Sequence, residues 1–433
     1  MPLRLDARSP DFGAAFNALL AMKREVAEDV DQAVRAIIAD VVARGDAALI
    51  GYSRKFDRVD LEKLGLRVSG ADIDAAFARC PGDALDALRF AHSRIIAFHE
   101  RQLPQDLRFT DPLGVELGWR WLPVEAVGLY VPGGTASYPS TVLMNAVPAK
   151  IAGVNRIVMT VPAPERRIDP FVLAAAKLAG VDEIYRVGGA QAIAALAYGT
   201  RTIAPVAKIA GPGGAYVAAA KRRVFGTVGI DMIAGPTEVL IIADSGANPE
   251  WIAADLLAQA EHGTDAQPIL ITNDESLAGA AEAAVARQLA VLPREKIAAA
   301  SWRDFGAIIL VSSLEESIAL ADRLAPEHLE IMTANAEAVG QRIRNAGAIF
   351  LGAYTPEAIG DYVGGSNHVL PTARSARFSS GLSVLDFMKR TSILKCGADS
   401  LARLGPAAIA LAGAEGLDAH ARSVALRIDH RIL

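Results

Sequence analysis

The sequence predicts an α/β protein with two Rossmann-like parallel-sheet lobes and helical segments at both ends. Short apolar runs typical of buried strands alternate with amphipathic segments typical of helices, first over residues 126–198 and again over residues 238–351. Strands that alternate with helices form βαβ units, whose sheets are largely parallel. The 433 residues, 52% of them apolar and 21% charged, supply ample material for such cores. This composition excludes a disordered chain.

Apolar residues at three- and four-residue spacing predict helices, and short apolar runs between turn residues predict strands. The expected strands cover residues 115–123, 126–131, 156–161, 183–187, 238–243, 267–272, 307–311 and 348–351. The expected helices cover residues 16–44, 81–102, 141–152, 170–179, 190–198, 249–262, 275–288, 314–324, 406–412 and 419–428. The helical ends suit arms that pack on a second copy of the chain, although a third local layer fits the pattern equally well.

Charge and cysteine content exclude several classes of protein. The chain has 44 Lys and Arg against 49 Asp and Glu, so no basic excess is available to neutralise a nucleic acid. Cys80 and Cys396 form neither a disulfide framework nor a CxxC pair, which favours a reducing compartment. Residues 1–11 lack the apolar core of a signal peptide, and prolines and glycines interrupt the charge-free stretch 126–149. We therefore expect a cytoplasmic protein that binds neither nucleic acid nor membrane.

Two glycine-rich turns follow predicted strands. The first covers residues 130–135 and the second residues 211–216, and such strand-to-helix turns bring backbone N–H groups against a pyrophosphate. Neither contains the full GxGxxG dinucleotide fingerprint, because in the second turn Tyr216 stands in the place of the third glycine. Plain tight turns therefore remain the alternative to dinucleotide binding. The tetrapeptide at 209–212 recurs at 233–236, which indicates two similar turns at strand ends.

Residues with the chemistry of metal ligands lie at helix ends. Gln259 and His262 are three residues apart, so both project from one helix face, and Gly263 is a natural helix terminator. Half of a metal site and a polar helix face with one histidine are both compatible with this spacing. In the C-terminal region, His420 lies five residues after Glu415, in the first turn of the last helix. The helix N-terminus favours a neutral, metal-competent imidazole there.

A carboxylate lies beside an imidazole at Glu327 and His328, directly after the predicted helix 314–324. Histidine is the usual general base near neutral pH, and glutamate is its usual companion for water activation. A surface turn is the alternative interpretation of this pair. Residues 362–368, which follow Asp361, are rich in glycine and polar residues and are typical of a functional loop.

Taken together, these motifs resemble those of one enzyme family. The chain is similar to histidinol dehydrogenase along nearly its whole length, through seven ordered segments at Val127–Gly134, Gly188–Ala192, Ile230–Glu238, Gln259–His262, Pro326–His328, Gly364–His368 and Ser380–Val384. The order and spacing of seven segments make this resemblance far more specific than any single motif.

The resemblance implies the last two steps of histidine biosynthesis, in which L-histidinol is oxidised to the aldehyde and then to L-histidine with two NAD and one water. It also implies one Zn²⁺ per subunit and a homodimer with shared active sites. The implied zinc ligands are Gln259, His262, Asp361 and His420 of the partner subunit. The implied substrate contacts are these four residues together with Thr237, His328 and Glu415, and His368 lies close by. Glu327 and His328 match the catalytic pair, and Tyr130, Gln191 and Gly214 occupy the positions of NAD contacts.

The implied chemistry suits these residue types. Amide, imidazole and carboxylate ligands suit zinc and leave positions open for two substrate nitrogens. Neutral His328 would accept the alcohol proton, and Glu327 would activate the water needed for the second oxidation. A cysteine nucleophile is a common alternative for aldehyde oxidation. However, Cys80 lies in a helical region and Cys396 lies outside every motif.

Two positions depart from the family pattern. Glycine stands at position 214, where the family usually has an asparagine that contacts NAD, so we expect weaker NAD binding. Thr237 stands where the family often has serine, and its hydroxyl is retained.

The resemblance also suggests a division into four segments. Residues 1–25 form an N-terminal helical arm, and residues 26–112 with 237–380 form the larger lobe, which carries the metal and catalytic residues. Residues 113–236 form the NAD lobe, and residues 381–433 form a helical tail that is exchanged in the dimer and supplies a metal ligand.

Three other functions remain as alternatives. The first is a zinc and NAD enzyme of the same fold that oxidises another small alcohol, such as a sulfonated diol. That alternative is weakened because the chain keeps the segment Ser380–Asp386 together with Glu415 and His420. The other two are a two-lobed ligand-binding protein and a metal-stabilised structural dimer.

Overall fold

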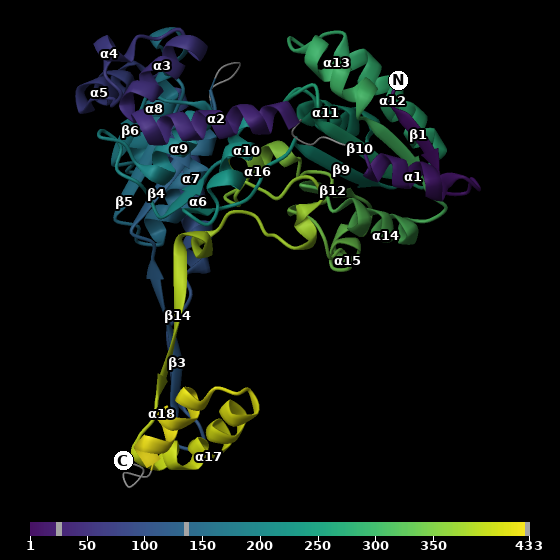
Figure 1. Ribbon diagram of the computed structural model, residues 1–433. Helices are drawn as coiled ribbons and strands as arrows, with labels where there is room; N and C mark the ends of the chain where they lie inside the picture. Colours follow the sequence, from purple (N-terminus) through teal and green to yellow (C-terminus); the bar gives the residue numbers. More distant parts are fainter. Residues whose placement is uncertain (23–27, 134–137, 429–433) are drawn as a thin grey trace. The chain divides into compact units, whose positions relative to one another are not determined.

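The computed structural model describes residues 1–22, 28–133 and 138–428 and separates the chain into two compact units. Unit 1 comprises Met1–Gln102 with Glu125–Phe387, and unit 2 comprises Leu103–Val124 with Met388–Leu433. Unit 1 contains two separate parallel sheets, each flanked by helices (Figure 1). In the described part of the chain, no helix is both long enough and apolar enough to cross a bilayer.

A six-stranded sheet forms one half of unit 1, in the order β1-β11-β10-β9-β12-β13, and every pair in it is parallel. Its strands are β1 (Leu3–Asp6), β9 (Glu238–Ala243), β10 (Gln267–Thr272), β11 (Ala307–Leu310), β12 (His328–Met332) and β13 (Ala348–Leu351). Val239 and Ile241 of β9 share a core with helices α11 (Pro249–Ala260), α12 (Glu275–Leu289) and α13 (Glu295–Asp304). Leu240 and Ile242 share the opposite core with α1 (Phe12–Leu20), α14 (Leu314–Leu324) and α15 (Ala336–Gly340). Both faces are therefore covered, as a parallel sheet requires.

A five-stranded parallel sheet forms the other half, in the order β6-β5-β4-β7-β8. Its strands are β4 (Ala126–Tyr130), β5 (Arg156–Thr160), β6 (Glu183–Tyr185), β7 (Lys208–Ala210) and β8 (Gly229–Ile230). One apolar core joins it to α2 (Glu28–Arg44), α3 (Asp46–Phe56), α9 (Gly189–Tyr198) and α10 (Ala215–Val224). Helices α6 (Gly82–His99), α7 (Pro139–Ile151) and α8 (Pro170–Leu178) pack together, with α7 against β4 and β5. Further helices of unit 1 are α4 (Leu61–Leu64), α5 (Gly70–Arg79) and α16 (Glu357–Tyr362).

The alternation of strands and helices from residue 126 onward confirms the prediction of two parallel-sheet lobes. The packing of the first hundred residues differs from the prediction, which grouped residues 26–112 with the lobe of residues 237–380. Val34, Ile37 and Val41 of α2 instead lie in the core of the five-stranded sheet. An amphipathic pattern predicts that a helix face is buried, but both sheets offer an apolar surface of the same kind to it.

The predicted N-terminal helical arm is wrong in its first residues. Leu3–Asp6 form β1, an edge strand that pairs with β11. Helix α1 follows, and its Phe16 and Leu19 are buried in the same core as Leu5. A four-residue strand is too short for its period to be distinguished from that of a helix. Residues 23–25 of the predicted arm lie outside the described residues.

Unit 2 consists of an antiparallel sheet and two helices. The strand order is β14-β3-β2, with β2 (Leu107–Thr110), β3 (Glu116–Pro123) and β14 (Met388–Lys395). The predicted strand at 115–123 is thus confirmed, but it pairs with the C-terminal segment rather than with the NAD lobe. The predicted helical tail begins with strand β14, followed by α17 (Ala398–Ala414) and α18 (Asp418–Ile428). A Cβ at Gly405 would lie 1.9 Å from Ile428 Cδ1, so glycine permits the close approach of these two helices.

Candidate active site

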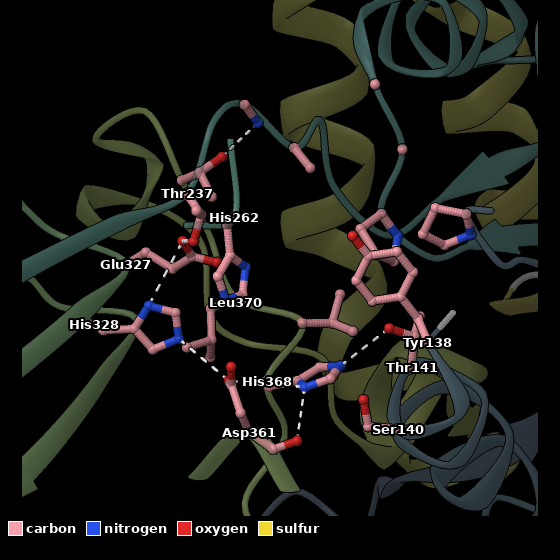
Figure 2. Close-up of a pocket in the computed structure, with 18 of the residues that line it drawn as sticks. Tyr138, Ser140, Thr141, Thr237, His262, Glu327, His328, Asp361, His368 and Leu370 are labelled. Atoms are coloured by element: carbon pink, nitrogen blue, oxygen red, sulfur yellow. Dashed lines mark hydrogen bonds and ion pairs between the residues drawn. The ribbon is translucent and has the colours of Figure 1, made fainter. Parts of the chain in front are cut away.

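A cavity of about 590 Å³ in unit 1 contains most of the residues singled out by the sequence. Thr237 and Glu327 line it from the amino ends of β9 and β12 in the six-stranded sheet. Pro132 and Gly213 line it from the carboxyl ends of β4 and β7 in the five-stranded sheet. Figure 2 shows the polar side chains that point into this cavity. The two sheets thus contribute different faces of one site.

Glu327 is held in a buried turn between α14 and β12. Ala325 ends α14 in the left-handed conformation (φ 45°), and Pro326 prevents the helix from continuing. Glu327 Oε2 accepts hydrogen bonds from Thr237 Oγ1 (2.5 Å) and the Glu238 backbone N–H (2.9 Å). Burial raises the pKa of the Glu327 carboxyl to about 7, while nearby His328 and the Thr237 hydrogen bond act in the opposite direction. The surface-turn interpretation is therefore wrong, because Glu327 is 7% exposed and His328 is 4% exposed.

His328 has one ring nitrogen satisfied and one free to react. Its Nδ1 lies 3.0 Å from the Glu238 carbonyl oxygen, so we assign the proton to Nδ1, which donates to that carbonyl. The lone pair then lies on Nε2, a buried atom without a hydrogen-bond partner among the described residues. The nearest carboxylate oxygen to Nε2 is Asp361 Oδ1, at 3.8 Å. This is the tautomer that a general base facing the cavity requires.

His368 and Asp361 line the cavity next to His328 (Figure 2). His368 Nδ1 lies 3.0 Å from the Asp361 backbone carbonyl, and its Nε2 lies 3.4 Å from Thr141 Oγ1. Burial lowers the pKa of the His368 imidazole, although the Asp361 carboxylate opposes this. A neutral ring that donates from Nδ1 leaves Nε2 as an acceptor at the cavity wall.

Helix α6 anchors the loop that carries His368. His99 Nδ1 bonds the Ile95 carbonyl (2.8 Å), and its Nε2 faces Asn367 Nδ2 (3.2 Å). Asn367 also donates to the Met144 carbonyl (2.6 Å). The sequence analysis did not assign His99 to the site, since an isolated helical histidine carries no signal of a contact 268 residues away.

A group of buried carboxyl groups lies behind the catalytic pair, and the sequence analysis did not single it out. Glu330 and Glu357 are 1% and 2% exposed, and the Glu357 N–H donates to Glu330 Oε1 (2.7 Å). Burial, reinforced by the charge of Glu330, raises the pKa of Glu357 well above its usual range. Burial likewise raises the pKa of Asp255 to about 6, beside Glu330. Asp255, Glu330 and Glu357 lie on three separate elements, α11, β12 and α16, so their grouping depends on tertiary packing.

Three of the expected metal ligands, Gln259, His262 and Asp361, belong to unit 1. His262 and Asp361 line the cavity, whereas the Gln259 amide is fully buried behind it. The Gln259 Nε2 donates to Thr237 Oγ1 (2.8 Å), whose own proton goes to Glu327 Oε2. The expected helix 249–262 ends at Ala260, so His262 follows the helix rather than closing its last turn.

The donor set available to a metal is small within the described residues. There, no three His, Cys, Asp or Glu side chains gather in a metal-binding arrangement. An imidazole and a carboxylate that line one cavity, with an amide directly behind, nevertheless supply the mixed nitrogen and oxygen donors that suit zinc. His420 lies in the first turn of α18 and Glu415 directly follows α17, and both are exposed in unit 2.

The expected NAD contacts lie around the turns that follow β4, β6 and β7. Tyr130 Oη accepts a hydrogen bond from the Gly189 N–H (3.1 Å), and Gln191 is buried in the first turn of α9. Gly214 is the residue directly before α10, and an added Cβ there would meet open space. Residues 134 and 135 of the first glycine-rich turn lie outside the described residues.

A buried ion pair supports the second glycine-rich turn. Lys221 and Asp231 are 1% and 0% exposed at their side chains and form an ion pair. Lys221 Nζ donates to the Gly211 carbonyl (3.0 Å), and Asp231 Oδ2 accepts from the Gly211 N–H (2.8 Å). Gly211 has a φ of 113°, and a Cβ there would lie 2.2 Å from the Tyr130 carbonyl oxygen. The pair therefore fixes the turn at 209–212 to Asp231, which directly follows β8.

Comparison with known proteins shows the family of the chain. Residues 20–428 match the family model described as histidinol dehydrogenase. The chain is 69% identical over 431 residues to a histidinol dehydrogenase of Rhodopseudomonas palustris, covering 100% of both chains. It is 68% identical to that of Brucella suis, over 99% of this chain and 100% of the relative. The crystal structure of histidinol dehydrogenase from Elizabethkingia anophelis superposes with a TM-score of 0.94 at 38% identity, covering 100% of this chain and 99% of the other. The chain therefore belongs to the histidinol dehydrogenase family.

Proposed function

We propose that this chain oxidises L-histidinol through L-histidinal to L-histidine with two NAD, as the final steps of histidine biosynthesis. The observation that carries the proposal is the pairing of His328 and Glu327 in one cavity. His328 offers a lone pair on a buried Nε2 that has no other partner among the described residues, and Glu327 offers a carboxylate with a pKa near neutrality. General-base catalysis is most effective when the pKa of the base lies near the working pH.

In the first oxidation, His328 Nε2 accepts the proton of the substrate hydroxyl group. NAD, when bound, takes up the hydride from the same carbon in each of the two oxidations. The Nδ1–H of His328 keeps donating to the Glu238 carbonyl, which holds the ring in place while Nε2 accepts the proton. The product of this step is the aldehyde.

In the second oxidation, Glu327 takes a proton from a water molecule as the water oxygen adds to the aldehyde carbon. Glu327 then returns this proton to the aldehyde oxygen, which completes the hydrate. His328 Nε2, after losing its first proton to solvent, accepts a hydroxyl proton of the hydrate as the second hydride leaves. The carboxylic acid that results ionises to the carboxylate of L-histidine. Thr237 orients Glu327 throughout, because its hydroxyl donates to Oε2 and leaves Oε1 to approach the water.

Gln259, His262 and Asp361, with His420 of the partner subunit, would hold the zinc ion. Zinc would orient the imidazole and amine nitrogens of the substrate. Glu415 of the partner subunit would contact the substrate, so the proposal requires a homodimer. Support comes from the donor types that line the cavity and from the exposure of Glu415 and His420 in unit 2. We also propose a cytoplasmic location.

Separate assays of the two oxidations test the catalytic roles. We expect His328→Asn to slow both oxidations by about 10²–10⁴-fold, the usual contribution of a general base. Glu327→Gln should slow the oxidation of L-histidinal by a similar factor. The rate at which this variant forms the first NADH from L-histidinol should stay within about tenfold of the rate of the unmodified enzyme. Equal losses in both half-reactions for Glu327→Gln would remove water activation from the role of Glu327.

Mixed dimers test the shared site. If His420 enters the cavity of the partner, a His328→Asn chain combined with a His420→Ala chain forms one intact site per dimer. Refolding the two inactive chains together should then restore activity, whereas each alone stays inactive. Failure to restore activity in a mixture shown to contain the mixed dimer would contradict the exchange.

The choice of substrate tests the alternative function. A sulfonated diol as the preferred substrate would favour the alternative alcohol dehydrogenase.

A further inference from the structure

The protein side chains of the active-site cavity have an unusual charge balance for a site that makes a carboxylate. Three carboxyl side chains line it, from Glu261, Glu327 and Asp361. Among the lining residues that the structure describes, Arg294 is the single lysine or arginine. Apart from the zinc ion of the proposed function, an anion formed in this cavity would meet mostly like charges, so the one permanently cationic side chain affects where that anion can bind.

The backbone of Arg294 is held in place by the start of a helix. It directly precedes α13, and its carbonyl accepts the first two helical hydrogen bonds, from Ile297 (3.0 Å) and Ala298 (3.1 Å). One turn later, Ser301 Oγ donates to the Ala266 carbonyl (2.9 Å). His262 lines the cavity, and Ala266 lies four residues after it. The hydrogen bond to Ala266 therefore connects α13 to the segment that begins at the cavity wall.

Among the described residues, none forms an ion pair with the side chain of Arg294. Its Nε is buried and makes no hydrogen bond with any described residue. Arg303, near the end of α13, instead forms two hydrogen bonds with Asp304 (2.8 and 2.6 Å). A buried cationic donor without a partner is costly, and such groups commonly mark a ligand contact. A guanidinium group recognises carboxylate and phosphate oxygens through paired hydrogen bonds.

We propose that Arg294 binds an oxyanion in the active-site cavity, and that this oxyanion is the carboxylate formed in the second oxidation. This inference rests on the proposed function, because it needs the alcohol carbon to become a carboxylate. Arg294 then contacts the product and not the substrate, since L-histidinol has a neutral hydroxyl group at that carbon. The pyrophosphate of the dinucleotide has similar chemistry and is the alternative source of the oxyanion.

Equilibrium binding to the full-length, zinc-loaded protein distinguishes these cases. We compare Arg294→Gln and Arg294→Lys with Arg303→Gln, which removes an arginine of α13 that does not line the cavity. Calorimetry gives the affinities for L-histidine, L-histidinol and NADH, and thermal unfolding shows whether each variant is folded. Arg294→Gln should weaken L-histidine binding by about 10–100-fold, the loss expected for a hydrogen bond to a charged group. The affinities of Arg294→Gln for L-histidinol and NADH should change less than about threefold. The L-histidine affinity of Arg294→Lys should lie between that of the unmodified protein and that of Arg294→Gln.

Three results would overturn the proposal. L-Histidine affinity that stays unchanged in folded Arg294→Gln removes the residue from product binding. A selective loss of NADH affinity assigns the guanidinium to the dinucleotide phosphates instead. An equal loss for all three ligands, with a lowered unfolding temperature, indicates a structural role. Failure of the proposed function is a separate result, because the unmodified chain would then neither bind L-histidinol nor reduce NAD with it.

Discussion

Removing the Thr237 hydroxyl should shift the pH dependence of the second oxidation to higher pH. Thr237→Val keeps the branched shape of the side chain but deletes the donor 2.5 Å from Glu327 Oε2. That oxygen then keeps one hydrogen bond, from the Glu238 N–H at 2.9 Å. Because the Thr237 hydrogen bond favours the ionised carboxylate, its loss raises the pKa of Glu327 above the value of about 7 that burial produces.

The size of the shift follows from the strength of that hydrogen bond. A hydrogen bond to a charged group contributes about 1.5–3 kcal/mol. One pKa unit corresponds to about 1.4 kcal/mol, so the pKa of Glu327 should rise by roughly 1–2 units. Glu327 must be ionised to take a proton from water. The rate therefore falls as pH decreases through its pKa, and in Thr237→Val this fall begins at higher pH.

The assay is kcat/KM for NAD-dependent oxidation of L-histidinal as a function of pH, at saturating zinc. Thr237→Ser retains the hydroxyl and is the matched control, with the profile of the unmodified enzyme. Zinc content is measured in each variant, because Thr237 also contacts Gln259. If the acidic limb of Thr237→Val coincides with that of Thr237→Ser, Glu327 is not the group whose ionisation limits this step.

Three further results are expected. Lys221→Met leaves the carboxylate of Asp231 buried without its cation and should lower the free energy of unfolding by about 3–5 kcal/mol in urea titrations; a change below about 1 kcal/mol would show that the pair does not stabilise the turn. Gly214→Asn has open space for its Cβ and should lower the KM for NAD at unchanged stability, and an unaltered KM would argue against a cofactor contact there. Chelation of the metal should abolish turnover without loss of secondary structure, whereas unfolding by the chelator, followed by circular dichroism, would favour the structural-dimer alternative.

The sequence predicts most of the sheet architecture because buried parallel strands have a distinctive composition. The bounds expected for β9, β10, α14 and β13 agree with the structure residue for residue. Strand β12 was not predicted, although all five of its residues are buried. It contains His328 and Glu330, and charged or titratable residues argue against a strand that is covered on both faces. The titratable side chains of this strand are therefore the reason why the sequence pattern does not predict it.

The composition of the site was easier to predict than its arrangement. Glu327, His328, Asp361 and His262 line one cavity, as the motifs suggested. Burial of Glu327, and therefore its raised pKa, depends on how α14 ends and on contacts with Thr237, 90 residues earlier. The free Nε2 of His328 likewise follows from a bond between its Nδ1 and the backbone of Glu238. Contacts between residues so far apart in the chain produce no periodic pattern in the sequence.

The most direct test of the proposed chemistry is the number of NADH formed per L-histidinol consumed by the zinc-loaded enzyme. Two NADH and one L-histidine per L-histidinol are expected, with no free aldehyde, because one cavity holds His328 for both oxidations and Glu327 for the second. One NADH per L-histidinol with accumulation of L-histidinal would contradict the second role of this pair.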